Sequence, residues 1–457
     1  IYKQHFSLAT GRCLEDKDQK LLVFPSKIEN GRVWISPTPQ KTYITNTGTS
    51  QEKMKLVLVG NGQAGMRCLE DLLDMAPDRY EVTVIGEEPW GNYNRIMLSP
   101  VLSGDKTIDD IMLHPHAWYS DKGIRFIAGD PAVRIDRPRK QVYTDKGEVV
   151  DYDRLILATG SKPFIPPIAG ADLKGVISFR DIYDINTMLD YCKTKKNAVV
   201  IGGGLLGLEA AYGLKQRGMN VTVLHLMDRI MERQLDSKAS QMLRHSIEQK
   251  GISIITEANT EALVGVDGHV TQIRLKDGTV LAADLVVFAV GIRPNMALAQ
   301  SAGLRCNRGV LVNDTMQTFD PSIYAVGECI EHRSQTFGLV EPLWGQAFIC
   351  ASHLAEHGSL TFKAPTVPTQ LKVSGCDVFS AGNFEPKDDF EDIILNDEKR
   401  QIYKRIIIQK DKVVGAVLFG DTEDGVWYAE LISDQTPISS IRNKLLFGKD
   451  FALKKAG

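Results

Sequence analysis

Two stretches of the chain share one order of residues: a short apolar run, a glycine-rich turn, and a longer segment with helical spacing of its apolar positions. The first stretch has its apolar run at 55–59 and the turn GNGQAG at 60–65. The second has its apolar run at 198–201 and the turn GGGLLG at 202–207. Each stretch therefore predicts a strand, a tight turn and a helix.

The first stretch continues with a helix predicted over 64–75 and a strand predicted over 81–85, which ends beside Glu87 and Glu88. In such a unit the first glycine permits the turn, the second lets the backbone approach a pyrophosphate, and the third lets helix and strand pack. A carboxylate about 20 residues past the glycines hydrogen-bonds a ribose diol, so either Glu87 or Glu88 is a candidate. Two such units predict two dinucleotides on one chain and redox chemistry between them.

Three further apolar runs end on glycine or on an acid and predict buried strands. Two pairs of apolar or β-branched runs predict antiparallel hairpins, one of them around an Asn-Gly pair, which is a strong turn signal. The buried strands are expected at 154–160, 284–291 and 323–328, and the hairpins at 21–24 with 32–35 and at 402–408 with 413–419.

The chain has 457 residues, of which 43% are hydrophobic, and a net charge of −3. This charge argues against a nucleic-acid partner, and no apolar run reaches the roughly 20 residues that span a membrane. None of the seven cysteines forms a C-x-x-C pair, which argues against a redox-active disulfide or a locally spaced metal site and fits a reducing cytoplasm. The chain begins at Ile1 with no visible signal peptide, so we expect a start that is processed or lies upstream.

The glycine turns at 60–65 and 202–207 are called the first and the second fingerprint below. These two fingerprints and two other segments resemble the two-dinucleotide flavoprotein reductases in residue type and in order along the chain. The resemblance covers about residues 54–350. It is carried by the turn at 60–65, by ATG at 158–160, by the second motif at 202–209, which ends in Glu209, and by YAVGE at 324–328.

A narrower resemblance is to the large subunit of assimilatory NAD(P)H nitrite reductases. It rests on NYNRIMLSPVL at 92–102, VLHLM at 223–227, MERQLD at 231–236, LKVSG at 371–375 and FSAG at 379–382. The N-terminus is similar to the tail of the small subunit of those enzymes, a Rieske-like β domain, through KQHFSL at 3–8, GRCLED at 11–16 and ENGRV at 29–33. A Rieske centre needs paired Cys and His ligands, and His5 has no Cys nearby, so we expect no cluster.

The resemblance implies an α/β chain with two Rossmann-like dinucleotide-binding domains, one for FAD and one for NAD(P). A small α+β domain is expected at the C-terminus and a β-rich, Rieske-like fragment at the N-terminus. The expected boundaries are 1–40 for the Rieske-like fragment, 41–53 for a linker, 54–165 with 292–360 for a discontinuous FAD-binding domain, 166–291 for the NAD(P)H-binding domain, and 361–457 for the C-terminal domain.

The resemblance assigns FAD to the first fingerprint. It implies that Arg95 offers a cation to the pyrophosphate or to the adenine end, and that Glu328 accepts from the ribitol hydroxyls. For Trp344, a place beside the isoalloxazine and a place in a core or interface are equally open. The expected FAD-binding residues are Gly60, Gly62, Gly65, Glu87, Glu88, Arg95, Thr159, Gly160, Gly327 and Glu328.

NAD(P)H is assigned in the same way to the second fingerprint, with Glu209 close to where nicotinamide meets flavin. NAD-specific sites usually carry an acid at the end of the next strand, where this chain has His225, followed by Arg229 and Arg233. A 2′-phosphate prefers the arginines, so NADH and NADPH both stay open, and the resemblance favours NADH slightly. The expected NAD(P)H-binding residues are Gly202, Gly204, Gly207, Glu209, His225 and Gly291.

The expected reaction needs no side-chain acid or base, because hydride passes from nicotinamide to flavin N5 and single electrons then leave the flavin. Residues 98–102, LSPVL, stand where disulfide reductases carry a Cys pair, which excludes a dithiol relay. The sequence thus predicts an FAD-dependent NAD(P)H oxidoreductase that feeds an iron–sulfur or siroheme partner in nitrite assimilation. We expect no iron–sulfur, siroheme or other metal site in the chain itself, and a homodimer stays open.

Two alternatives remain at this point. The same module would serve assimilatory nitrate reductase, a rubredoxin or a ferredoxin equally well, because nothing in these residues names the acceptor. In a different class, the chain is a flavin-bound assembly scaffold or redox sensor, whose flavin would pass electrons only slowly to an artificial acceptor.

Overall fold

The computed structural model describes residues 21–29, 32–39, 53–356, 360–364, 369–373, 375–385 and 389–453. Contacts between residues divide the chain into two units. Unit 1 holds the residues up to Tyr93 together with Leu113–Ser161 and Pro294–Lys363, and unit 2 holds Asn94–Met112, Lys162–Arg293 and the residues from Ala364 onward.

Unit 1 is built on a five-stranded parallel sheet with the strand order β23-β11-β3-β4-β7. The order reverses beside β3, because β4 lies on one side of it and β11 on the other. Continuous apolar runs suit such strands, since helices or loops cover both faces of a parallel sheet. The strands are β3 (Met54–Val59), β4 (Tyr80–Gly86), β7 (Arg125–Ala128), β11 (Arg154–Leu157) and β23 (Ile323–Ala325).

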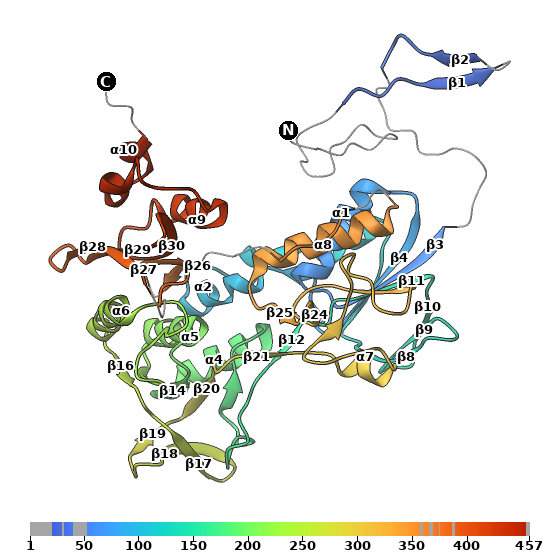
Figure 1. Ribbon diagram of the computed structural model, residues 1–457. Coiled ribbons are helices and arrows are strands. Elements are labelled where there is room, and N and C mark those ends of the chain that lie inside the picture. Colours follow the sequence, from blue (N-terminus) through green and yellow to red (C-terminus); the bar gives the residue numbers. More distant parts are fainter. Residues whose placement is uncertain are drawn as a thin grey trace. The chain divides into compact units, whose positions relative to one another are not determined.

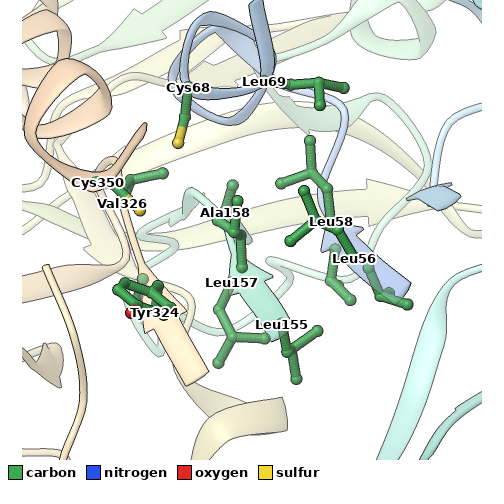
Figure 2. Packing of buried hydrophobic residues seen from close by; sticks show 14 of the residues in the cluster. Leu56, Leu58, Cys68, Leu69, Leu155, Leu157, Ala158, Tyr324, Val326 and Cys350 are labelled. Atoms are coloured by element: carbon green, nitrogen blue, oxygen red, sulfur yellow. The ribbon is translucent and has the colours of Figure 1, made fainter. Parts of the chain in front are cut away.

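Helices α1 (Gln63–Met75) and α8 (Val340–Leu354) run side by side in unit 1 (Figure 1). Cys68 of α1 and Cys350 of α8 belong to one buried cluster with Leu58 of β3 and Leu157 of β11 (Figure 2). The rest of unit 1 includes α3 (His116–Asp121), α7 (Ala297–Ser301), the antiparallel strands β8 (Ala132–Asp136), β9 (Gln141–Thr144) and β10 (Val149–Asp151), and the short strands β22 (Val310–Leu311), β24 (Ile330–His332) and β25 (Gln335–Thr336).

Unit 2 contains a second five-stranded parallel sheet, with the order β13-β20-β14-β15-β16. Here the order reverses beside β14. Its strands are β13 (Val176–Ser178), β14 (Asn197–Ile201), β15 (Asn220–Leu224), β16 (Ile252–Ile255) and β20 (Leu285–Phe288). Its helices are α2 (Leu98–Ser103), α4 (Ile182–Thr194), α5 (Leu205–Gln216) and α6 (Ser237–Gln249), and an antiparallel sheet is formed by β17 (Thr260–Val266), β18 (His269–Leu275) and β19 (Val280–Ala282).

The C-terminal part of unit 2 is an antiparallel sheet of order β26-β27-β30-β29-β28, with α9 (Gly425–Asp434) packed against β27 and β30. Lys410 and Asp411 form the two-residue turn between β29 and β30 with φ of 50° and 58°, as the twist of a tight hairpin requires. The strands are β26 (Thr369–Val373), β27 (Cys376–Gly382), β28 (Glu391–Asp397), β29 (Ile402–Gln409) and β30 (Lys412–Phe419), and α10 (Lys449–Leu453) follows α9.

Most predicted elements are confirmed. The strands expected at 154–160, 284–291 and 323–328 each end three residues early, at Leu157, Phe288 and Ala325. The reason is that each run has a glycine with positive φ at its end or one residue before it, 64° at Gly160, 114° at Gly291 and 95° at Gly327, which a strand does not accommodate.

The N-terminal hairpin is confirmed, but its first strand was placed wrongly. Strand β2 (Arg32–Ile35) pairs with β1 (Ser26–Glu29) and not with 21–24. Because Glu29 faces Arg32, only two residues separate the paired strands, and the partner of β2 lies at 26–29. Residues 30 and 31, His5 and most of the predicted linker at 41–53 lie outside the described residues.

A buried carboxylate joins the two parts of unit 2. Asp236 caps α6 by accepting from Ala239 N (2.9 Å), and its other oxygen accepts from Tyr403 Oη (2.8 Å) and pairs with Arg405 Nη1 (3.2 Å), both on β29. Its side chain is 6% exposed. Burial of Tyr403 beside this carboxylate raises the pKa of the phenol.

We expect Asp236→Ala to destabilise unit 2 by about 3 kcal/mol, because it removes a cap and leaves Arg405 with less compensation in a buried place. Calorimetric unfolding of the whole chain measures the effect. Glu248→Ala on the same helix is the matched control, since the Arg244–Glu248 pair is exposed and should be worth less than about 1 kcal/mol. Equal effects of the two substitutions would contradict the role given to Asp236.

Candidate functional site

The glycines of the first fingerprint lie where the strand order of unit 1 reverses, at the carboxyl ends of β3 and β11. Gly60 has φ +107°, and a Cβ there would overlap the Ala158 carbonyl oxygen. A Cβ on Gly65 would lie 2.7 Å from Ala158 Cβ. Gly62 is different, because a Cβ there meets no atom of the described residues within 4 Å. The fold itself thus requires glycine at two of these positions, and at the third it leaves open space in which a ligand could lie against the backbone.

The second fingerprint repeats this arrangement where the strand order of unit 2 reverses. Gly202 has φ +125°, and a Cβ there would overlap the Ala289 carbonyl oxygen. A Cβ on Gly207 would overlap Gly202 O, whereas one on Gly204 meets no atom within 4 Å in the part of the chain that the structure describes. Gly62 and Gly204 are also the N-caps of α1 and α5, and neither has a side chain to cap its helix. Bare helix N-termini at open glycines are suited to bind phosphate groups.

The structure places Glu87 and Glu88 directly after β4, the neighbour of β3. Glu88 Oε2 accepts from Tyr93 Oη (2.7 Å), whereas Glu87 is exposed. Asn61, inside the fingerprint, accepts from Tyr119 Oη through its side chain (2.6 Å) and from Asn92 Nδ2 through its carbonyl (2.8 Å). Burial raises the pKa of Tyr119 to about 12, so the phenol remains a donor. These bonds brace the turn and were not foreseen from the sequence.

Thr159, Gly160, Gly327 and Glu328 gather at the same sheet edge, because they follow the parallel strands β11 and β23. Thr159 Oγ1 donates to the Asn295 carbonyl (2.6 Å), and Glu328 accepts from Ser161 Oγ (2.6 Å). Sequence reasoning missed Asn295 and Ser161; only Ser161, directly after Gly160, carried a signal in its position.

Gln346 of α8 was also missed and lies beside this edge. Gly327 N donates to Gln346 Oε1 over 2.8 Å, and the side chain is fully buried. Its Nε2 has no hydrogen-bond partner among the described residues. A buried amide donor without an acceptor is costly, which fits an acceptor supplied by a bound group.

Two further predicted site residues, Arg95 and Trp344, make contacts within the protein. Arg95 belongs to unit 2, where its Nη1 donates to the Arg180 carbonyl (2.8 Å). Trp344 lies on α8 at 36% exposure, with the guanidinium carbon of Arg67 5.8 Å from its ring centroid. For Trp344 this leaves both predicted roles open.

The second site includes a half-buried acid, Glu209, on α5. It accepts from Ser99 Oγ of α2 at 2.6 Å. Burial raises the pKa of Glu209, and the bond from Ser99 offsets this in part. Gly291 lies in open space at φ +114°, and His225 follows β15, with both ring nitrogens bonded to protein groups.

The cysteines that the structure describes are all free thiols. Residues 98–102 form part of α2 and contain no cysteine. Among the described residues we find no cluster of three potential metal ligands and no helix long and apolar enough to cross a membrane.

Two glycine turns at two reversals of strand order define a reductase of the two-dinucleotide class. The chain belongs to the pyridine nucleotide-disulphide oxidoreductase family, whose model matches residues 54–346. Residues 368–436 match the C-terminal domain of rubredoxin NAD⁺ reductases, and 1–36 match a Rieske-like [2Fe-2S] domain. The fold class, the oxidoreductase class and the Rieske-like fragment predicted from the sequence are thereby confirmed.

Individual relatives agree with the family. The chain is 49% identical over 387 residues to the nitrite reductase [NAD(P)H] of Bacillus subtilis, covering 85% of this chain and 48% of the relative. It is 42% identical over 395 residues to the assimilatory nitrate reductase electron transfer subunit of the same organism, covering 86% and 51%. The structure of NADH:rubredoxin oxidoreductase from Clostridium acetobutylicum matches with a TM-score of 0.71 at 26% identity, covering 85% of this chain and 97% of that one.

The chain spans about half the length of the two curated relatives. The family implies FAD and NAD(P)H, and the residues present fit two such groups. The fit rests on the open space at Gly62 and Gly204 and on the unpartnered amide of Gln346. The assignment of each residue to a group, and the domain boundaries, stay predictions.

We expect Gly62→Val to fold and to lose FAD, because Gly62 has φ −84° and ψ 176°, which valine adopts, while its side chain would fill the open space. The flavin content of the purified protein measures this. Gly204→Val is the matched control, with φ −82° and ψ 180°, and it should keep the flavin. Stoichiometric FAD in Gly62→Val would contradict the assignment of FAD to the first fingerprint.

Glu209 should make stability depend on pH. Well below the ordinary pKa of glutamate, the carboxyl is protonated in folded and unfolded chains alike, so its burial carries no ionisation penalty. As pH rises past that value and through the raised pKa that Glu209 has in the folded chain, the folded chain loses stability. Glu209→Gln should therefore raise the melting temperature more at about pH 8 than at about pH 5, and Ser99→Ala should lower it more at the higher pH. A pH-independent offset in both variants would contradict this account.

Proposed function

We propose that the first fingerprint binds FAD, that the second binds NAD(P)H, and that the chain is the electron-input module of a nitrite-assimilating enzyme. The observation that carries the proposal is the repeated glycine geometry, in which Gly62 and Gly204 alone are open among the glycines of their turns. When bound, the flavin accepts hydride from the nicotinamide and releases electrons singly.

The chain's own residues bind and orient the two groups. The N-termini of α1 and α5 offer backbone N–H groups to the two pyrophosphates. Glu328, oriented by Ser161, accepts from ribitol hydroxyls, and Gln346 offers its unpartnered Nε2 to an acceptor of the bound group. Glu209, held by Ser99, fixes the nicotinamide end. No side chain is assigned as an acid or a base.

The acceptor is an iron–sulfur or siroheme protein or domain. The names of the two Bacillus relatives support nitrite or nitrate assimilation, and we place nitrite first because that relative is the more similar of the two. The second candidate is a rubredoxin, since the chain covers 97% of an NADH:rubredoxin oxidoreductase and matches the C-terminal domain of that enzyme group. We also propose a cytoplasmic location, on the basis of the free thiols among the described residues.

The purified chain should be yellow, NAD(P)H should bleach it without oxygen, and ferricyanide should restore the colour. Nitrite should not, because no siroheme or iron–sulfur site is assigned to this chain. Stopped-flow absorbance measures each step. Nitrite-dependent consumption of NAD(P)H by the 457-residue chain would refute the proposal that the chain is only an electron-input module. Slow turnover with ferricyanide would favour a redox sensor.

A further inference from the structure

The loop after β15 returns to the second glycine turn. It begins at His225 and ends at Asp236, the N-cap of α6. Met231, fully buried with φ +53°, donates its backbone N–H to the Gly203 carbonyl over 3.0 Å. The loop is therefore fixed on the backbone that is proposed to hold the pyrophosphate, and Glu232 follows directly after this anchor.

His225 connects the glycine turn to Glu232. Gly203 N donates to His225 Nδ1 at 3.0 Å, so Nδ1 is an acceptor and the ring proton is on Nε2. Nε2 then donates to Glu232 Oε2 at 3.1 Å. The two side chains are 10% and 23% exposed. Both ring nitrogens are thus used within the protein, and the imidazole holds the carboxylate beside the end of β15.

An acid is usually found at that strand end when the adenosine ribose carries a free 2′-hydroxyl. The sequence has histidine there, but the structure brings the carboxylate of Glu232 to it from seven residues downstream. Oε2 is held by His225, and Oε1 lies 3.7 Å from Nε of Arg233, a side chain that is 86% exposed. The carboxylate is partly buried and oriented, as a ribose-binding group must be.

The two arginines that a 2′-phosphate would need are already balanced by acids. Arg229 Nη2 donates to Glu385 Oε1 at 2.5 Å, and its Nη1 lies 3.6 Å from Asp228 Oδ1. Arg233 neighbours Glu232 itself. A 2′-phosphate would therefore meet a carboxylate and no uncompensated cation among these residues, and such like-charge contacts are strongly unfavourable.

Building on the proposed binding of NAD(P)H to the second fingerprint, we infer that Glu232 accepts from the adenosine ribose 2′-hydroxyl. His225 is its positioning residue, and the site selects NADH over NADPH. This resolves the choice that the sequence left open.

The test measures binding of ADP-ribose and of 2′-phospho-ADP-ribose to the whole flavin-loaded chain by calorimetry, since neither ligand carries a nicotinamide to be oxidised. The parent chain should bind ADP-ribose at least about tenfold more tightly. Glu232→Gln and Glu232→Ala should each reduce that ratio about tenfold or more, with unchanged melting temperature. Glu248→Gln, which removes an exposed acid on α6 outside this loop, should leave the ratio unchanged.

Two histidine variants test the positioning role. His225→Gln retains a carbonyl that can accept from Gly203 N and an amide that can donate to Glu232, so it should keep most of the selectivity. His225→Ala should lose it while the NADH:NADPH ratio of kcat/KM falls in parallel. A purely structural histidine would instead lower stability and binding of both ligands without changing their ratio.

Several outcomes would overturn the inference. A parent chain that prefers the 2′-phosphorylated ligand, a ratio unaffected by both Glu232 variants, or a ratio that Glu248→Gln changes as much as the Glu232 variants do would each overturn it while leaving the second fingerprint as the NAD(P)H site. Failure of the parent chain to bind either ligand would overturn the proposed function of that fingerprint as well.

Discussion

The close approach of each glycine turn to the neighbouring strand is the constraint on which the rest depends. In both parallel sheets the first glycine leaves no room for a Cβ against a carbonyl of the next strand, Ala158 in unit 1 and Ala289 in unit 2. The turn can then close tightly enough for a helix to begin directly at the sheet edge. That edge consequently presents helix N–H groups and bare backbone where no side chain intervenes.

The three glycines of the G-x-G-x-x-G pattern in each turn are needed for different physical reasons, and this difference separates what folding requires from what ligand binding requires. The first and third are enforced by neighbouring atoms, so any side chain there disturbs the sheet. The second has ordinary backbone angles and empty surroundings. A residue type that the fold does not require points to something outside the protein. Its occurrence in both units makes two similar ligands the simplest explanation.

The class of fold and the main elements could be predicted from the sequence because glycine spacing and apolar runs are local signals. The hairpin of β29 and β30 and the strand-turn-helix units followed directly. The groups that orient the site could not, because their partners lie far along the chain: Ser99 and Glu209 are 110 residues apart, Ser161 and Glu328 are 167 apart. Serine, asparagine and glutamine are common surface residues, and only the fold shows which of them are buried against an acid or a backbone group.

The anchoring of the loop between His225 and Asp236 bears on how such reductases can be recombined. Two residues of this loop bind groups in the C-terminal part of the chain. Asp236 is bonded to Tyr403 and Arg405, and Arg229 is bonded to Glu385. Suppose that a chimera took this C-terminal part from another reductase to suit a new electron acceptor. The exchange would remove the groups that hold the loop between His225 and Asp236. Acceptor and coenzyme preference would then change together, and the smallest unit that can be exchanged intact is the nucleotide fold with its C-terminal sheet.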